Sequence, residues 1–314
     1  MEKGTRTRTL VTGGAGFIGS NLVKELVKQG DIVTILDDFS TGKIENLKDI
    51  NIDKIKIVVG SVCNLNLMKK LMNENDRIFH LVATCLVSCN ENPIIANEAN
   101  VTGTFNACLS AYEAGAKLIY ISSSEVYGSC QISPMSESHP IEPQSIYGLS
   151  KLMCEQYVKF FNKYYNLRTV IIRPFNAYGP NHRNDQYAAV ITAFIRKLEK
   201  GEPLIIEGTG EQSRDFTYIS DTVDGILLLS NLENGEIINI GNGNATTIND
   251  LTKTLFKIYN VNNIKDNIIF KEPRINNVFK LESDIKLANS YGYKPKVSIE
   301  EGLKKYITWW RENQ

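Results

Sequence analysis

The first half of the chain alternates short apolar runs with segments of helical periodicity, and this alternation restricts the fold more than any other feature. Runs rich in Val and Ile predict buried strands, and they span residues 7–13, 31–37, 54–60, 76–83, 116–122 and 168–174. Apolar residues at spacings of three and four predict helices between them, over residues 18–30, 66–75, 101–115 and 150–166. Strands joined by helical crossovers run parallel, so we expect an α/β fold with a doubly wound parallel sheet.

The length of 314 residues exceeds the size of one usual core, so a second, smaller unit is expected. The regular alternation ends after the sixth apolar run, and one further helix near residues 188–200 lies between polar loops. We predict a larger α/β domain formed by residues 1–175 together with about 216–243. A smaller C-terminal lobe would be formed by residues of about 176–215 and by 244–314.

The composition is that of an ordinary globular protein, in which 35 basic side chains balance 35 acidic ones. No binding surface for nucleic acid or for a membrane is therefore expected. No apolar run approaches the roughly 20 residues that span a bilayer, and the N-terminal residues contain no signal-peptide core, so a cytoplasmic location is expected. The six cysteines include no CxxC pair and the three histidines are not at metal spacing, so no metal site is predicted.

The segment LVTGGAGFIGS follows the first predicted strand and opens the first predicted helix. Its glycines are Gly13, Gly14, Gly16 and Gly19. Glycines at this spacing allow a tight turn and a close approach of the backbone to a pyrophosphate, as in a Rossmann dinucleotide site. The second strand ends in Asp37 and Asp38, where a carboxylate can accept hydrogen bonds from an adenosine ribose and disfavours a 2′-phosphate. We therefore predict NAD, rather than NADP, as the cofactor.

The segment SIYGLSK places Tyr147 and Lys151 four residues apart at the start of a predicted helix, so that both side chains lie on one face. A tyrosine is a poor base at neutral pH, but a neighbouring ammonium group and the positive nicotinamide would favour its phenolate. Ser123 stands at the carboxyl end of the fifth predicted strand, at the edge where open α/β sheets bind ligands. These three side chains would supply a base, a group that lowers its pKa, and a hydroxyl that orients a substrate oxygen.

Further motifs accompany these sites in the order TGGAGFIGS, DDFSTG, NVTGT, SSSEVYG, YGLSK, RPFNAYGP, YAAVI and GTGEQSRDFTYISD. In this order they resemble the extended short-chain dehydrogenase/reductase superfamily, and most of all its nucleotide-sugar epimerase/dehydratase branch. Within that branch they are most similar to UDP-glucose and UDP-N-acetylglucosamine 4-epimerases. The resemblance implies that the larger domain binds NAD, that the smaller lobe binds a UDP-sugar, and that the protein is a homodimer.

The resemblance also implies a role for each group at the reacting centre. Tyr147, as phenolate, would remove the proton of the sugar 4-hydroxyl while a hydride moves from C4 to NAD, and the 4-keto sugar would then receive the hydride on its other face. Ser123 would hydrogen-bond the reacting oxygen, and Lys151 would bind the nicotinamide ribose. The implied activity is a UDP-hexose 4-epimerase for UDP-glucose and UDP-galactose, with the N-acetylated pair as a further candidate.

Other positions match family contacts and are carried over in the same way. Besides Tyr147 and Lys151, those facing NAD would be Gly13, Gly16, Phe17, Ile18, Gly19, Asp37, Asp38, Ser40, Gly42, Ser61, Val62, Leu81, Val82, Ala83, Ser122 and Pro174. Those facing the nucleotide sugar would be Ser123, Ser124, Asn176, Val190, Arg214 and Arg274. The two arginines suit a diphosphate because a guanidinium forms charge-assisted, often bidentate bonds with it.

Three departures from the family pattern affect binding contacts only. Ser61 stands where the family usually has an aspartate that binds the adenine amine, and Val82 is bulkier than the usual alanine beside the cofactor. Asn276 and Asn277 replace a glycine and an aspartate near a ribose contact.

Glu125 leaves a second activity open, and if the fifth strand stays extended its side chain points to the same side as that of Ser123. It lies two residues after Ser123, where nucleotide-sugar 4,6-dehydratases and UDP-glucuronate decarboxylases carry a glutamate that acts at C5. The dTDP-glucose dehydratases place an aspartate directly before that glutamate, whereas this chain has Ser124, and decarboxylases tolerate a small hydroxyl residue there. A third hypothesis is a non-catalytic protein that binds NAD and acts as a regulator. Such proteins typically lose the tyrosine or the lysine, and this chain has both.

The expected homodimer would use the helices near residues 97–114 and 147–165, which pair with their symmetry mates in many relatives. Phe105, Tyr157 and Phe161 would contribute to that face.

Overall fold

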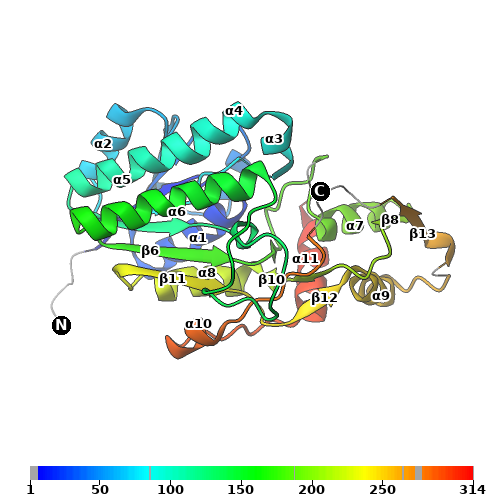
Figure 1. Ribbon diagram of the computed structural model, residues 1–314. Helices are drawn as coiled ribbons and strands as arrows, with labels where there is room; N and C mark the ends of the chain where they lie inside the picture. Colours follow the sequence, from blue (N-terminus) through cyan, green and yellow to red (C-terminus); the bar gives the residue numbers. More distant parts are fainter. Residues whose placement is uncertain (1–5, 85, 187, 264, 273–277, 314) are drawn as a thin grey trace.

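The computed structural model describes residues 6–84, 86–186, 188–263, 265–272 and 278–313. Its centre is a seven-stranded sheet in the order β11-β6-β5-β4-β1-β2-β3, in which every neighbouring pair is parallel (Figure 1). The strands are β1 (Arg8–Thr12), β2 (Ile32–Asp37), β3 (Ile55–Val59), β4 (Arg77–His80), β5 (Lys117–Ile121), β6 (Thr169–Pro174) and β11 (Asn234–Ile240). The predicted α/β fold with a doubly wound parallel sheet is confirmed, and β1 to β6 lie within the six predicted runs.

Helices cover both faces of this sheet. They are α1 (Phe17–Gln29), α2 (Leu65–Asn73), α5 (Gly103–Glu113), α6 (Ile146–Tyr165) and α8 (Ile219–Leu229). Leu118 and Tyr120 of β5 belong to the core formed with α2, α5 and α6, whereas Ile119 and Ile121 belong to the core formed with α1 and α8. Successive side chains of a strand point to opposite faces, so a strand buried on both sides needs an unbroken apolar run, as the sequence has here.

Most of the elements after β6 lie beyond the carboxyl ends of the strands (Figure 1). They are β7 (Ala177–Tyr178), α7 (Val190–Glu199), β8 (Leu204–Glu207), β9 (Ser213–Asp215), β10 (Thr217–Tyr218), β12 (Ala245–Thr247), α9 (Ile248–Tyr259), β13 (Ile268–Lys271) and α11 (Ile299–Glu312). They include three two-stranded sheets, β10-β7, β12-β9 and β13-β8. The short helices α3 (Leu86–Glu91) and α4 (Pro93–Ala96) follow β4, and α10 (Lys286–Ser290) lies near β11. The proposed domain boundaries stay a prediction.

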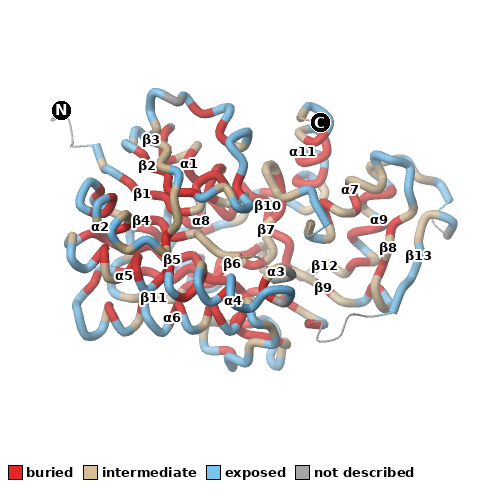
Figure 2. Tube along the Cα trace, turned by 90° about the horizontal axis from the view of Figure 1, so that it is seen from above, coloured by how far each residue is buried: buried red, intermediate tan, exposed pale blue. Residues whose placement is uncertain are grey.

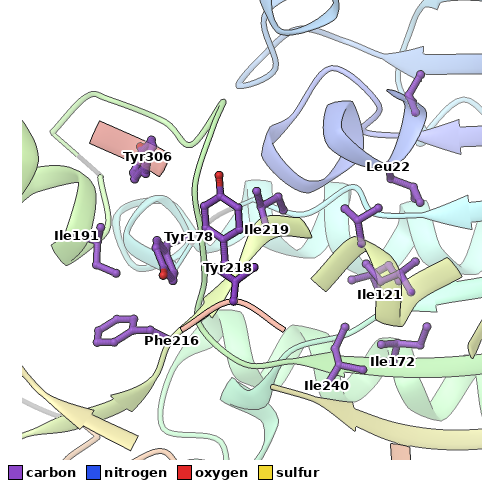
Figure 3. Packing of buried hydrophobic residues seen from close by; sticks show 14 of the residues in the cluster. Leu22, Ile121, Ile172, Tyr178, Ile191, Phe216, Tyr218, Ile219, Ile240 and Tyr306 are labelled. Carbon is purple, nitrogen blue, oxygen red and sulfur yellow. The ribbon is translucent and has the colours of Figure 1, made fainter. Parts of the chain in front are cut away.

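One hydrophobic cluster joins the sheet to these C-terminal elements. It includes Ile121 of β5 on the sheet side and Phe216 and Tyr306 on the other side (Figure 3). Tyr178 and Tyr218 lie between them with ring centroids 5.5 Å apart. Figure 2 shows buried segments in the central strands and in α9 and α11 alike. A shared core of this kind fixes the position of the C-terminal elements relative to the central sheet. It thereby also fixes the size of the space between them.

The strand β11 and the helix α8 were not predicted as elements, although the predicted boundaries place residues 216–243 with the sheet. The first residues of β11 are Asn-Gly-Glu, which favour a turn, and a bulge interrupts its pairing with β6 between Asn234 and Glu236. Only Ile238, Asn239 and Ile240 at its end are buried. An edge strand with so short a buried part leaves little periodicity in the sequence.

A buried ion pair fastens α6 to the sheet. The Glu155 carboxylate accepts hydrogen bonds from Nε and Nη2 of Arg173 at 2.8 and 2.6 Å, and both side chains are at most 1% exposed. The same carboxylate accepts a 2.6 Å bond from the Ser122 hydroxyl. Nη1 of Arg173 donates to the Tyr127 hydroxyl, which donates to Asn239 of β11. Burial alone would lower the pKa of Arg173. The hydrogen bonds to Glu155 and its negative charge outweigh this effect and raise the pKa above its usual value, so the guanidinium stays charged.

We predict that Arg173→Met lowers the free energy of unfolding by about 3–5 kcal/mol, because it leaves the Glu155 carboxylate buried without its cation. Urea unfolding followed by circular dichroism measures this change.

A double variant, Glu155→Leu with Arg173→Met, serves as the matched control. It removes both charges and should recover part of the loss, since no uncompensated ion remains in the core. Arg8→Met breaks an exposed pair with Asp76 and should leave the unfolding midpoint almost unchanged. A midpoint shift for Arg173→Met no larger than that for Arg8→Met would contradict the prediction.

Candidate active site

The carboxyl ends of the central strands border a cleft of about 360 Å³. The cleft lies beside β1 and β4, which are neighbours in the sheet although the chain continues from them in opposite directions. In open α/β sheets ligands bind at this kind of topological switch point. The loop after β1, the ends of β2 to β5, the first turns of α6 and the segment after β6 supply the lining.

The loop after β1 presents backbone N–H groups to the cleft. Gly13 has a φ of +71°, and a Cβ on Gly19 would lie 2.1 Å from the Gly13 carbonyl oxygen, so neither position accepts a side chain without strain. Gly16 is the N-cap of α1 and provides no side-chain cap. The N–H groups of Phe17 and Ile18 in the first helical turn therefore remain available. Together with the helix dipole they can hold an anion such as a pyrophosphate.

The two aspartates after β2 differ in their surroundings. Asp37 is buried, and its carboxylate accepts 2.9 Å bonds from the N–H groups of Ala15 and Phe39. Burial raises the pKa of Asp37, and these two bonds lower it in part. Asp38 is exposed and accepts bonds from the N–H and the hydroxyl of Ser40. The buried carboxylate thus braces the loop after β1 against β2, and both aspartates line the cleft.

Tyr147 and Lys151 lie one turn apart near the start of α6. The Ser145 hydroxyl begins this helix by accepting a 3.0 Å bond from the Gly148 N–H. The Nζ of Lys151 donates a 2.7 Å bond to the carbonyl oxygen of Ile121 at the end of β5. Burial lowers the pKa of Lys151 to about 8, so its amine is still mostly protonated at neutral pH. Tyr147 is half-buried and faces the same cleft.

The segment around Ser123 corrects one expectation about the strand. The strand alternation that would place Ser123 and Glu125 on one side does not apply, because β5 ends at Ile121 and residues 124–126 form a 3₁₀ turn. The Ser123 hydroxyl caps this turn by accepting a 3.2 Å bond from the Glu125 N–H. Both side chains nevertheless line the cleft. Burial raises the pKa of Glu125, and the positive charge of Arg214 lowers it in part.

The structure brings most of the predicted site residues together on this cleft. The predicted cofactor contacts that line it are Gly13, Gly16, Phe17, Ile18, Gly19, Asp37, Asp38, Ser40, Ser61, Val62, Leu81, Val82, Ala83, Ser122, Tyr147, Lys151 and Pro174. Gly42 is not among the lining residues, because it packs behind the loop, where a Cβ would lie 2.9 Å from Asp37.

The predicted substrate contacts are placed less uniformly. Ser123, Ser124 and Asn176 line the cleft, and the buried side-chain oxygen of Asn176 has no hydrogen-bond partner among the described residues. Val190 at the start of α7 and Arg214 in β9 are outside the lining. Arg274 lies outside the described residues, as do Asn276 and Asn277. A buried acceptor without a partner costs free energy, so Asn176 is suited to receive a donor group from a ligand.

Several lining residues were missed from the sequence. They are Leu36, Thr41, Gly60, Thr84, Ala99, Ile121, Ala177 and His182. Most of them are neighbours in the chain of predicted contacts, so the strand ends could have indicated them. His182 carries no such signal, because it reaches the cleft from a loop between β7 and α7.

The described part of the chain contains no group of three potential metal ligands and no helix long and apolar enough to cross a membrane.

Comparison with known proteins places this cleft in a family. The sequence model described as "NAD dependent epimerase/dehydratase family" matches residues 9–241. The chain belongs to this family. Membership confirms the predicted resemblance to nucleotide-sugar epimerases and dehydratases and the prediction of NAD as the cofactor.

Relatives within the family carry the names of different enzymes. A Methanocaldococcus jannaschii protein with a provisional name as a UDP-glucose 4-epimerase is 36% identical over 97% of this chain and 98% of its own length. A UDP-N-acetyl-alpha-D-glucosaminuronate decarboxylase of Bacillus cytotoxicus is 35% identical over 98% of each chain. The structure of a UDP-N-acetylglucosamine 4-epimerase of Methanobrevibacter ruminantium, in complex with UDP-N-acetylmuramic acid, superposes with a TM-score of 0.92. It is 31% identical and the match covers 99% of this chain and 100% of that one. The family is therefore one of NAD-dependent enzymes that epimerise, dehydrate or decarboxylate nucleotide sugars.

Proposed function

We propose that the protein is a UDP-hexose 4-epimerase that interconverts UDP-glucose and UDP-galactose, with the N-acetylated pair as a further substrate. One observation carries the proposal: Ser123, Tyr147 and Lys151 line the same cleft as the glycine loop. The 4-epimerase names of two of the relatives support it.

When bound in this cleft, NAD would supply the acceptor and the donor of the hydride at C4. Tyr147 would take the proton of the 4-hydroxyl as its phenolate form. Lys151 favours that phenolate by its charge, and its Nζ is held in place by the Ile121 carbonyl oxygen. The hydroxyl of Ser123 would donate a hydrogen bond to the oxygen that becomes the 4-keto group. After reduction of C4 on its other face, Tyr147 would give its proton back to this oxygen.

The nucleotide sugar would extend from this centre toward the C-terminal elements. We propose that residues 1–175 with about 216–243 bind NAD and that about 176–215 and 244–314 bind the UDP-sugar. The side-chain oxygen of Asn176, to which none of the described residues donates, would accept a hydrogen bond from the substrate. Arg214, together with Arg274, would bind the diphosphate, because guanidinium groups form charge-assisted bonds with phosphates.

A second candidate function uses Glu125. In a 4,6-dehydratase or a UDP-glucuronate decarboxylase this carboxylate would act at C5 of the 4-keto sugar. Its place on the same cleft and its raised pKa favour a group that exchanges protons. The decarboxylase name of one relative points the same way. The charge of Arg214 stabilises the carboxylate form of Glu125. In an epimerase this carboxylate would take no part in proton transfer and would only orient the arginine.

The product distinguishes an epimerase from a lyase. Incubation with UDP-glucose or UDP-N-acetylglucosamine should give the C4 epimer without loss of water or carbon dioxide, as followed by NMR. Tyr147→Phe should lower kcat by roughly 10²–10⁴-fold, the usual contribution of a general base, while NAD stays bound. UDP-glucuronate and dTDP-glucose are the matched substrates for the alternative, and a pentose or 4-keto-6-deoxy product from them would contradict the epimerase proposal.

Glu125→Gln separates the two functions because it keeps the shape of the side chain and removes its charge and its proton exchange. For an epimerase we expect turnover of UDP-glucose within roughly tenfold of the original, since no general-base step depends on the carboxylate. For a lyase, product formation would stop at the 4-keto sugar. Glu137→Gln, a second carboxylate whose pKa burial raises but which is outside the cleft lining, is the control.

We also propose a homodimer through an aromatic face on α5 and α6. The face consists of the exposed residues Phe105, Tyr112, Tyr157, Phe160, Tyr164 and Tyr165. The predicted contact Phe161 is buried beneath it and is 5% exposed. A contiguous exposed apolar patch of this kind is typical of an interface between protein chains.

Light scattering should give twice the 35.3 kDa mass of one chain. Phe160→Glu should shift the protein to the monomer, because the charge would be buried without a partner at the interface. Phe270→Glu changes an exposed phenylalanine of β13, which is not part of this face, and should leave the mass unchanged. A monomeric original protein would rule out the dimer.

A further inference from the structure

The aromatic ring of Tyr120 lies against the ammonium group of Lys151, at a position to which the sequence assigned no role. The Nζ atom lies over the face of the ring, 5.0 Å from its centroid. Tyr120 is in β5 and is 1% exposed, and Lys151 is 2% exposed. The negative face of an aromatic ring attracts a cation, and this attraction is stronger where water is excluded. The contact is therefore a buried cation–π interaction at the proposed active-site lysine.

The ring of Tyr120 is fixed in place by its strand and by a neighbouring histidine. Within the sheet Tyr120 is paired with His80 of β4 on one side and with Ile171 of β6 on the other. The imidazole of His80 is also stacked on the ring of Tyr120, with centroids 6.1 Å apart and an interplanar angle of 27°. His80 is in turn hydrogen-bonded to the hydroxyls of Thr12 and Thr104, at 2.8 and 3.1 Å. The ring therefore presents its face to Lys151 from a rigid support.

Lys151 has few other contacts that stabilise its charge. Its Nζ donates a hydrogen bond to the carbonyl oxygen of Ile121. An ammonium group has three N–H donors, so one carbonyl acceptor is a poor substitute for its hydration. The carboxylate of Glu155, one turn along α6, bonds to Arg173 and Ser122 instead. Within the described ranges of the chain the ion pair of Glu155 is with Arg173, and Lys151 forms none.

The titratable groups around Lys151 come from several elements, and they are His80 of β4, Cys89 of α3, Tyr120 of β5, and Tyr147, Cys154 and Glu155 of α6. Burial lowers the pKa of His80 to about 3, so its imidazole is neutral. The thiols of Cys89 and Cys154 each donate a bond to a backbone carbonyl oxygen and so carry their hydrogens. Burial raises the pKa of Tyr120, so its hydroxyl is neutral as well. The ring face thus acts on Lys151 as a quadrupole and not as a charge.

We propose that Tyr120 is a positioning residue that holds the ammonium group of Lys151 against its ring face and keeps it charged beside Tyr147. The inference rests on the roles of Tyr147 and Lys151 set out under the proposed function, and it adds the support behind the lysine. Tyr120 and Ile121 are consecutive in β5, so a single strand supplies both the ring and the carbonyl oxygen. A charged Lys151 in turn favours the phenolate of Tyr147.

The charge of Lys151 is measured directly by NMR, on the full chain saturated with NAD and without any sugar. Lysine enriched in ¹³C at Cε reports the protonation of each amine, and Lys151→Met identifies the resonance of Lys151. Tyr120→Leu removes the ring, and we expect the pKa of Lys151 to fall by roughly one unit, as for loss of a cation–π contact away from water. Tyr120→Phe keeps the ring face and should leave this pKa unchanged.

Two further variants separate the cation–π contact from the packing of the core. Tyr120→Met fills much of the vacated space with a flexible side chain and should lower the pKa of Lys151 as Tyr120→Leu does. Leu118→Ala opens a cavity in the same core, two residues earlier in β5, and should leave the pKa unchanged. If the ring only fills space, its loss lets water reach the amine, and the pKa of Lys151 rises toward its ordinary value.

An unchanged or raised pKa of Lys151 in Tyr120→Leu or Tyr120→Met would overturn the proposal, as would an equal fall in Tyr120→Phe or Leu118→Ala. A wrong choice between epimerase and lyase would appear in the products of the sugar incubations. It would leave this titration as it is, because no sugar is present.

Discussion

The buried ion pair between Glu155 and Arg173 is the interaction on which the geometry of the cleft depends. It joins the middle of α6 to β6, and through the Ser122 hydroxyl it also reaches the end of β5. Tyr147 and Lys151 are on α6, whereas Ser123 follows β5, so the separation between the proposed base and the proposed hydroxyl is set by this contact. A buried pair gives little net stability, because the desolvation of two ions offsets their attraction. Its value here is one of position, since the two charges satisfy each other in only one arrangement of helix and sheet.

The cleft itself results from topology and from a shared core. The chain leaves β1 and β4 in opposite directions, which opens a space at the carboxyl edge of the sheet. The apolar cluster around Tyr178 and Tyr218 continues from the sheet into the C-terminal elements and holds them against the sheet. His182 is held at the same boundary by bonds between its loop and α1. A ligand that spans the cleft would therefore contact both halves of the chain.

Within this family a common scaffold serves several reactions. Relatives at 35% and 36% identity carry the names of a decarboxylase and, provisionally, of an epimerase, so the fold does not select the reaction. Among the proposed site residues, Glu125 is the one whose role differs between the two candidate functions. Burial raises the pKa of the Glu125 carboxyl, the charge of Arg214 lowers it in part, and the residue before it is Ser124. Whether its proton moves during turnover distinguishes a lyase from an epimerase.

The sequence alone determined the features that local pattern encodes. The glycine spacing, the aspartates after β2 and the pairing of Tyr147 with Lys151 on one helical face follow from short-range geometry, and six of the seven central strands were predicted from apolar runs. The tertiary structure decided what depends on contacts between distant segments. The 3₁₀ turn after Ser123 replaced the expected extended strand because the serine hydroxyl caps it, and β11 pairs at the sheet edge despite its weak apolar pattern. The Glu155 to Arg173 pair and the approach of His182 to Phe17 join residues 18 and 165 positions apart, so no local periodicity could predict them.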